Sequence, residues 1–267
     1  MAGRRPRGLW LFAALALVFV YAPIAVMVLF SFNTTEIAVW PMRGFTFDWY
    51  GEMVQSEKIR AAFLLSVRVA LIATLVAGVL GTTLAYAAHR FRFPGKRLLQ
   101  RIVLMPLVVP GVVTGIALLT IFDQIQVQLS VTTIVLGHIT FLIAVFFTTV
   151  FARLQGLGTH IERAAMDLGA SEVRAFFVAV LPNLRTTLIG AAVIAFTLSF
   201  DEIAVTFFLT GTQNTVPMLI YSMLRTGLTP TVNALATTSL LISLVPIAVA
   251  AAVGARIARE GRAEVLP

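Results

Sequence analysis

The sequence contains no cysteine, and only 12% of its 267 residues are Asp, Glu, Lys or Arg. The absence of cysteine excludes a disulfide framework, thiol catalysis and any cysteine-ligated metal site. Soluble domains contain about 25% charged residues, roughly twice the fraction found here. Hydrophobic residues make up 59% of the chain. These proportions indicate a membrane protein that crosses the bilayer several times.

The sequence also lacks the motifs that bind nucleotides or carry out common hydrolytic reactions. It contains no G-x-x-x-x-G-K-[ST] phosphate-binding loop, since Gly95 and Lys96 are followed by Arg97, and it contains no H-E-x-x-H metal motif. Its three histidines are scattered along the chain. Nothing in the sequence therefore supports catalysis. Uphill movement of a solute would need energy from an ion gradient or from another subunit.

Six apolar segments are long enough to cross a bilayer as helices, which takes about 20 residues each. They cover, approximately, residues 9–30, 62–88, 102–122, 131–152, 187–209 and 234–258. We interpret the first as a retained helix, because its apolar run exceeds the roughly 7–15 residues of a signal peptide. The sequence therefore predicts an all-α membrane protein with six transmembrane helices, in a single transmembrane domain over 1–267.

The third segment is unusual because it contains Pro106, Pro110, Gly111 and Gly115. Proline interrupts the backbone hydrogen bonds of a helix, which a membrane tolerates where neighbouring helices or a cavity satisfy the freed carbonyls. Glycines four residues apart allow helices to pack closely. Close packing is the simpler interpretation. The alternative is an unwound helix that lines a transport pathway.

The net charge of +8 records the orientation of the chain in the membrane. Of the 20 Lys and Arg residues, 15 fall in the two ends, the 89–101 loop and the 153–187 loop, against 4 in the opposite loops. Basic residues accumulate on the cytoplasmic side, so this distribution predicts that both termini are cytoplasmic. The basic 89–101 loop suggests nucleic-acid binding at first sight. Apolar segments flank it so closely that a cytoplasmic membrane loop is the better interpretation, and we expect no nucleic-acid partner.

One polar stretch, residues 154–185, separates the fourth and fifth segments. Thr159 and Glu162 have the spacing of a capping box at the start of a helix. An apolar face follows at helical spacing, with Ile161, Ala164, Ala165 and Leu168. Gly169 can adopt a positive φ and end this helix. The small residues of this face suit insertion into a groove of another protein.

A second helix is expected after Gly169. Ser171 can cap it, and Glu172 in its first turn complements the helix dipole. Its apolar face consists of Val173, Phe176, Phe177 and Val180. Pro182 is expected to break the run before the fifth transmembrane segment.

The fifth segment carries two adjacent carboxylates, Asp201 and Glu202, in otherwise apolar surroundings. Charges at that depth are costly unless they face a cavity or a partner. Ser199 shares a helical face with Glu202, and Thr197 shares one with Asp201. These four residues are candidates for guiding a cationic solute. The alternative is structural pairing, for example with Arg68 or with a partner subunit.

The 154–185 stretch resembles the cytoplasmic loop of type I ABC importer permeases, which carries Glu-Ala-Ala, then Gly, then Leu-Pro. The matching residues are Arg163-Ala164-Ala165, Gly169 and Leu181-Pro182. Arg163 stands where the family usually has Glu, with Glu162 one place earlier, and Ala179 replaces a larger aliphatic residue. The resemblance implies a coupling helix that docks on an ATPase subunit through Glu162, Arg163, Ala164, Ala165, Asp167, Leu168 and Gly169.

Further motifs resemble the spermidine/putrescine permeases, among them Ser31-Phe32-Asn33, Trp49-Tyr50 and His138-Ile139-Thr140-Phe141. This resemblance implies a permease subunit of a binding-protein-dependent importer of polyamines or a related cationic solute, in a bacterial inner membrane. The implied partners are two ATPase subunits, a second and different permease, an extracytoplasmic solute-binding protein and membrane lipid. ATP and Mg²⁺ would be bound by the ATPase, and no cofactor is expected in this chain.

Three other interpretations remain open at this point. An ABC permease could carry a different solute, such as iron, thiamine or an amino-acid-like compound. An ion-coupled secondary transporter could use Asp201, Glu202 and His138, although it would leave the patterned loop unexplained. A single membrane histidine is more simply a hydrogen-bonded packing residue. A membrane scaffold without transport would not need acids inside a transmembrane segment.

Overall fold

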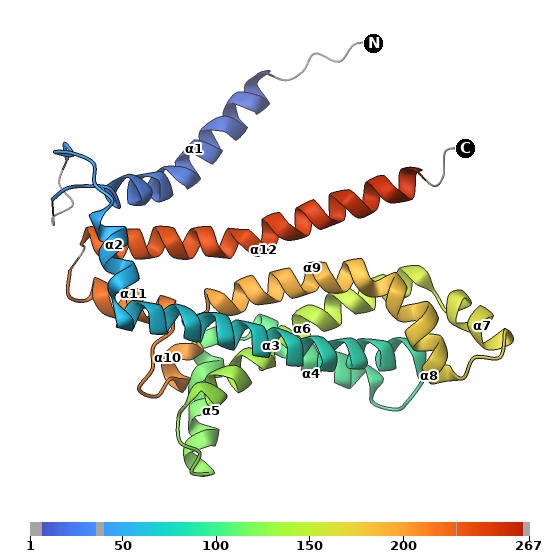
Figure 1. Ribbon diagram of the computed structural model, residues 1–267. Coiled ribbons are helices and arrows are strands. Elements are labelled where there is room, and N and C mark those ends of the chain that lie inside the picture. The colour runs from blue at the N-terminus through green and yellow to red at the C-terminus, as the bar shows by residue number, and fades with distance from the viewer. Residues whose placement is uncertain (1–6, 36–39, 228, 264–267) are drawn as a thin grey trace. The chain divides into compact units, whose positions relative to one another are not determined.

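The computed structural model describes residues 7–35, 40–227 and 229–263, and every helix or strand element in that part of the chain is helical. The elements in Figure 1 are α1 (Arg7–Phe30), α2 (Asp48–Gln55), α3 (Glu57–Arg90), α4 (Lys96–Val108), α5 (Gly111–Gln124), α6 (Val131–Leu157), α7 (His160–Asp167), α8 (Glu172–Ala175), the π-helical turn η1 (Phe176–Val180), α9 (Leu181–Phe200), α10 (Thr206–Leu209), α11 (Val216–Leu224) and α12 (Pro230–Ala263). Among these residues, five helices are long and apolar enough to cross a membrane, and α4 with α5 would make a sixth. An all-helical chain with five to six apolar spans is thus confirmed.

The chain divides into two compact units. The first takes residues up to Arg60 together with Ile220–Leu241. In it, the indole N–H of Trp49 donates to the Asn33 carbonyl over 2.7 Å, and Ser31 shares a 2.6 Å hydrogen bond with the Tyr50 hydroxyl. These bonds fix the start of α2 against the end of α1. The second unit holds Ala61–Leu219 and the chain from Ile242 onward, and it contains the candidate site.

Small residues on α3 allow the helices of the second unit to approach closely. Ala73, Ala77, Gly81 and Ala85 recur every four residues along one face of α3, and all four are buried. Such small-residue faces let membrane helices make close van der Waals contact. A Cβ atom at Gly81 would lie 2.6 Å from the Cβ of Phe146 on α6. α6 in turn packs against α9, α4, α10 and α5, so it forms the centre of this unit.

The third apolar segment is not one straight helix, as its length had predicted. α4 and α5 meet at an angle of 109°. Pro110 has no N–H to continue α4, and it restricts the preceding Val109 to the extended conformation that the structure shows. The Pro110 carbonyl instead accepts hydrogen bonds from the N–H groups of Val113 and Thr114. The proline therefore ends one helix and starts the next.

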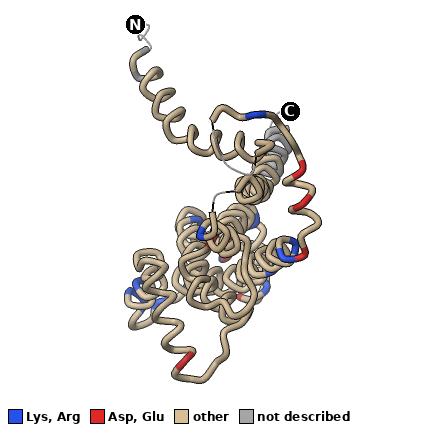
Figure 2. Tube along the Cα trace, turned by 90° about the vertical axis from the view of Figure 1, so that its left-hand side faces the viewer, with Lys and Arg blue, Asp and Glu red and all other residues tan. Residues whose placement is uncertain are grey.

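The stretch between the fifth and sixth predicted segments, residues 210–233, is not all loop, because it contains α11. Its sequence, VPMLIYSML, is apolar enough for a short helix, and its first N–H, on Val216, donates to the Ser66 hydroxyl of α3 over 2.8 Å. Charged residues are sparse along the helices, as the coloured trace in Figure 2 shows. One of them, Arg68, is exposed, and no ion pair found among the described residues includes it.

The α3–α6 contact can be tested with Gly81→Ala. The added methyl group would meet Phe146 Cβ and, at 2.8 Å, the Ile143 carbonyl oxygen, neither of which can move freely. We expect a loss of about 1–3 kcal/mol of stability, measured as a lower thermal midpoint of the purified protein. Gly190→Ala is the matched control, because nothing lies within 4 Å of its Cβ position. Equal midpoints for the two variants would contradict the contact.

Candidate functional site

The polar loop between α6 and α9 turns at Gly169, as the sequence predicts. Gly169 has φ of +89°, and α7 ends just before it. The N–H of Ala170 donates to the Ala165 carbonyl over 3.1 Å, and the N–H of Gly169 donates to the Met166 carbonyl over 2.8 Å. These two bonds form a Schellman motif, in which a left-handed glycine satisfies the last carbonyls of a helix. The prediction for Gly169 is confirmed.

Of the two helix caps predicted in the loop, the structure contains one. Ser171 caps α8 as predicted, since its hydroxyl accepts a 3.3 Å hydrogen bond from the Arg174 N–H. The capping box predicted for α7 is wrong, because the Thr159 side chain makes no cap hydrogen bond. Its supposed partner, Glu162, is directed toward α3 instead, where stronger donors are present.

Glu162 is the anchor of the loop. Its Oε1 accepts a 2.7 Å hydrogen bond from the Tyr86 hydroxyl and a 2.9 Å hydrogen bond from Arg90 Nε, both in the last turns of α3. Only 3% of Glu162 is exposed. Arg90 also lies 3.6 Å from the carboxylate of Glu172 on α8. Residues from α7 and α8 thus converge on the end of α3.

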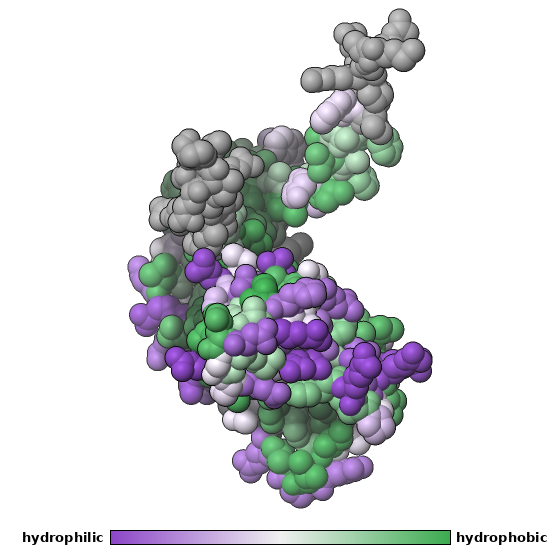
Figure 3. All heavy atoms as spheres, turned by 90° about the vertical axis from the view of Figure 1, so that its right-hand side faces the viewer, coloured by the Kyte–Doolittle hydropathy of each residue, from purple (hydrophilic) through white to green (hydrophobic). Residues whose placement is uncertain are grey.

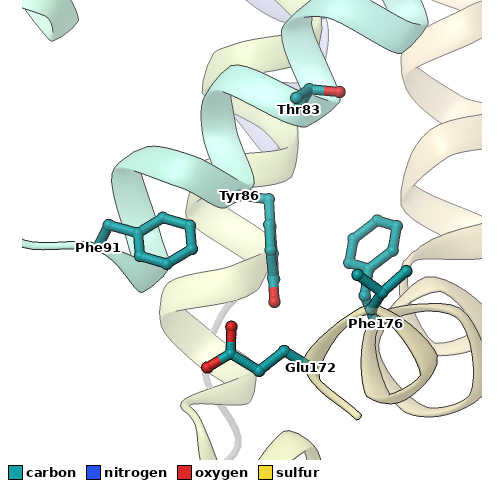
Figure 4. A pocket seen from close by; sticks show the side chains of 6 residues that line it. Thr83, Tyr86, Phe91, Glu172 and Phe176 are labelled. Carbon is teal, nitrogen blue, oxygen red and sulfur yellow. The ribbon is translucent and has the colours of Figure 1, made fainter.

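Around this contact, Tyr86 packs edge-on against Phe176, with ring centroids 4.7 Å apart. A cavity of about 260 Å³ remains between α3 and α8, lined by Thr83, Tyr86, Phe91, Glu172, Val173 and Phe176. Figure 4 shows the Tyr86 hydroxyl directed toward the loop that carries Glu172. The sequence alone did not predict that Tyr86 and Arg90 are the partners of Glu162. The available signal was their spacing of four residues, which puts both on one face at the end of a transmembrane helix.

The rest of α7 is open to solvent or to a partner. Arg163, Ala164 and Asp167 are exposed, Ala165 is half-buried, and Leu168 is 90% exposed. Figure 3 shows hydrophilic side chains gathered around the end of the unit where α7 and α8 lie, with hydrophobic patches between them. An exposed leucine beside a glycine turn offers a small apolar contact surface. Of the seven predicted docking residues, only Glu162 is buried.

The helix after Gly169 runs on past Pro182, which the sequence predicted to break it. α8, η1 and α9 are continuous, and the wider turn of η1 comes directly before the proline. In this turn the Leu181 N–H donates to the Phe176 carbonyl, five residues back. The Asn183 side chain donates to the Ala179 carbonyl over 2.8 Å. A π-helical turn and a side-chain amide thus accommodate the proline without ending the helix.

The two carboxylates of the fifth segment lie at a helix break, not within a helix. α9 ends at Phe200, and α10 begins only at Thr206. The Glu202 Oε1 accepts a 2.8 Å hydrogen bond from the Val205 N–H. Asp201 is exposed, and its Oδ1 accepts a 3.1 Å hydrogen bond from the Ser243 hydroxyl. The two acids therefore have different partners.

Ser199 and Thr197, the two hydroxyl residues predicted to share faces with the acids, have buried hydroxyl groups, whereas Asp201 is exposed. Ser199 is buried and shares a 2.7 Å hydrogen bond with Nδ1 of His138, whose Nε2 shares a 2.8 Å bond with Thr206. The Thr197 hydroxyl is buried, with no hydrogen-bond partner among the described residues. Both ring nitrogens of His138 are engaged, as the packing interpretation expected. Ser199 and Thr197 are therefore not on an open surface with Asp201.

These observations define a class of protein: an all-helical chain with several apolar spans and an exposed polar loop that is anchored to α3. The chain belongs to the family described as binding-protein-dependent transport system inner membrane component, whose model matches residues 77–259. The resemblance to ABC importer permeases is thereby confirmed. Membership of this family implies a non-catalytic membrane subunit.

Among its relatives are two permeases of Escherichia coli K12. The putrescine transport system permease protein PotI is 38% identical over 232 residues, which cover 84% of this chain and 82% of that protein. The spermidine/putrescine transport system permease protein PotC is 34% identical over 249 residues, or 92% and 93% of the two chains. The fold is similar to that in the crystal structure of a bacterial ABC transporter involved in the import of alginate. That similarity has a TM-score of 0.70 at 17% identity, over 93% of this chain and 96% of the other.

The role of His138 in packing gives a prediction. His138→Leu would remove the hydrogen bonds of the imidazole to the buried hydroxyls of Ser199 and Thr206, and Thr206 would keep its bond to the Glu202 carbonyl. We expect a loss of about 1–3 kcal/mol of stability, seen as a lower midpoint in thermal unfolding of the purified protein. Thr149→Val is the control, because among the residues that the structure describes the Thr149 hydroxyl bonds to the Val145 carbonyl of its own helix. The packing interpretation fails if the histidine variant unfolds no earlier than this control.

Proposed function

We propose that this chain is the permease subunit of an ATP-driven, binding-protein-dependent importer for putrescine, spermidine or a related polyamine. The family membership supports an importer permease. The names of two relatives that match over most of their length support a polyamine as the solute. The observation that carries the proposal is the exposed α7–Gly169–α8 loop, which offers a docking surface on a subunit whose sequence has no phosphate-binding loop.

The charge distribution supports the orientation of this subunit. With 15 of the 20 basic residues in the two ends and the 89–101 and 153–187 loops, both termini and the docking loop would lie in the cytoplasm. That side of the inner membrane is where ATP is available. Two ATPase subunits would bind ATP and Mg²⁺ and contact the loop, with one site on this chain. A second, different permease would complete the pathway, and an extracytoplasmic binding protein would deliver the solute.

In this proposal, motion of the ATPase subunits is transferred through the loop to the membrane helices. Closure of the ATPases would displace α7 and α8, because the exposed part of the loop from Arg163 to Gly169 would lie in their cleft. The loop is continuous with α6 and α9, so its displacement would rotate these helices and open the pathway to the other side. Hydrolysis of ATP would reset the loop. Docking would depend mainly on shape, since Arg163 replaces the usual Glu and Glu162 is directed inward.

The carboxylate of Asp201 is the better candidate for contact with a cationic solute. It is exposed, whereas an oxygen of Glu202 is occupied by the Val205 N–H. Ammonium groups of a polyamine are matched in charge by a carboxylate, and hydrogen bonds to charged groups contribute about 1.5–3 kcal/mol. Glu202, Ser199 and Thr197 would then shape the break in the helix, and Asp201 would face the solute.

The docking assignment can be tested with Gly169→Val. A β-branched residue at a φ of +89° costs about 1–3 kcal/mol, so the turn should shift and binding of the ATPase should weaken about tenfold or more. Copurification of the ATPase and uptake of putrescine by the reconstituted transporter measure this. Gly169→Asn is the control, because asparagine tolerates the left-handed conformation and should retain most binding. Full binding and uptake by the valine variant would refute the docking role.

The solute contact can be tested with Asp201→Asn. Loss of the charge should lower the uptake of putrescine about tenfold or more, while the Ser243 hydrogen bond can persist. Glu202→Gln should have a smaller effect, because its amide oxygen can still accept from the Val205 N–H. Asp123→Asn removes an exposed acid at the end of α5 and controls for the loss of negative charge. Unchanged uptake by Asp201→Asn would remove this residue from the pathway.

A further inference from the structure

The last two turns of α3 contact residues of α7, α8 and η1. Tyr86 and Arg90 bind Glu162 of α7, Arg90 lies near Glu172 of α8, and Tyr86 packs on Phe176 of η1. We propose that Tyr86, Arg90 and Glu162 form a rigid joint that makes α3 move together with the docking loop during transport. The three are positioning residues, since none of them lies on the exposed part of the loop. This inference rests on the proposed function.

The strength of the joint comes from the burial of Glu162. A carboxylate that is 3% exposed is stable only when strong donors satisfy it, and here two donors meet on the same oxygen. Any movement of α7 away from α3 would leave this charge buried without a partner. The contact of Arg90 with Glu172 is longer, and the Glu172 side chain is 67% exposed, so it contributes less. The contacts of Glu162 on α7 therefore contribute more to the joint than the contact of Arg90 with α8.

The packing around the Arg90–Glu162 ion pair also indicates that α7 is held more firmly than α8. Around Glu162, the space left between Tyr86, Ile161 and Val180 is only about 10 Å³, roughly the volume of one water-sized probe. A cluster of buried side chains continues below it into the bundle: Ala85, Ala88, Phe147, Val150, Leu154, Val180 and Leu184. On the α8 side the cavity is about 260 Å³. The loop is thus tightly packed against α3 on one side and loosely on the other.

The joint determines which helices are displaced together with the docking loop. The chain connects the docking loop directly to α6 and α9, while Arg90 is 72 residues away from Glu162 in the sequence. The joint therefore adds α3 as a third helix that is displaced with the loop. Because α3 packs on α6 along its small-residue face, the three helices would turn as one body. Without the joint, ATP hydrolysis would move α7 and leave α3 behind.

A distance measurement tests this directly, and the absence of cysteine in the chain makes it simple. Spin labels at Val79→Cys on α3 and His160→Cys on α7 occupy exposed positions. In the assembled transporter, we expect the same narrow distance with and without ATP. Adding Glu162→Gln or Tyr86→Phe should broaden the distribution or make it depend on ATP. A distance that already changes with ATP in the otherwise unmodified chain would overturn the proposal.

A second measurement counts the ATP hydrolysed per putrescine imported by the reconstituted transporter. Glu162→Gln and Arg90→Gln should each raise this ratio about fivefold or more, and the double variant should raise it no further, because both changes break one contact. Tyr86→Phe, which keeps the aromatic contact and the fold, should raise it less. Arg97→Gln removes an exposed arginine on α4 and should leave it unchanged.

A purely structural role would lower hydrolysis and import in parallel, so an unchanged ratio in the Glu162 and Tyr86 variants would overturn the joint. Failure of the proposed function gives a different result. In that case the unmodified chain, assembled with the ATPase, would show no putrescine-dependent ATP hydrolysis. If the unmodified chain couples normally and the variants couple equally well, the joint alone is wrong.

Discussion

The buried carboxylate of Glu162 is the constraint on which the arrangement of the loop between α6 and α9 depends. A charge removed from water costs several kcal/mol unless good donors satisfy it, and the donors here come from the last turns of α3. Because Tyr86 and Arg90 hold α7 from one side, the opposite side, with Leu168 and Gly169, is directed outward. The exposed surface of α7 is thus oriented by an interaction on its buried side.

This interaction would be of little use if α3 were loosely packed. Apolar helices in lipid gain no hydrophobic energy by associating, so they depend on close contact between small residues. The buried face of Ala73, Ala77, Gly81 and Ala85 provides this contact with α6. Tyr86 and Arg90, in the last turns of the same helix, hold Glu162. One helix, α3, therefore contributes both to the packing of the bundle and to the position of α7.

The sequence was informative where the determinant is local. Gly169 and Ser171 act through their own backbone and neighbours, and both behave as predicted. The sequence-based predictions were wrong where the structure depends on partners that are distant in the chain. Glu162 had the spacing of a capping box, but its actual partners lie more than 70 residues earlier in the chain. The prolines of the third segment indicated an interrupted helix as the alternative to a continuous one, and the structure shows the interruption at Pro110. The break after Phe200 was not predicted, because the apolar residues on both sides of Asp201 and Glu202 favoured one continuous helix.

Those two breaks are related in space, which explains how acids are tolerated between apolar spans. A Cβ atom at Gly111 would lie 3.0 Å from the Cβ of Ala204 and 3.8 Å from Glu202 Oε1. The start of α5 thus packs directly on the segment between α9 and α10. Non-helical backbone at membrane depth requires partners for its freed polar groups, and Glu202 supplies one by accepting from Val205. One carboxylate is therefore used to stabilise the break, and its neighbour Asp201 is left exposed on the surface that the break creates.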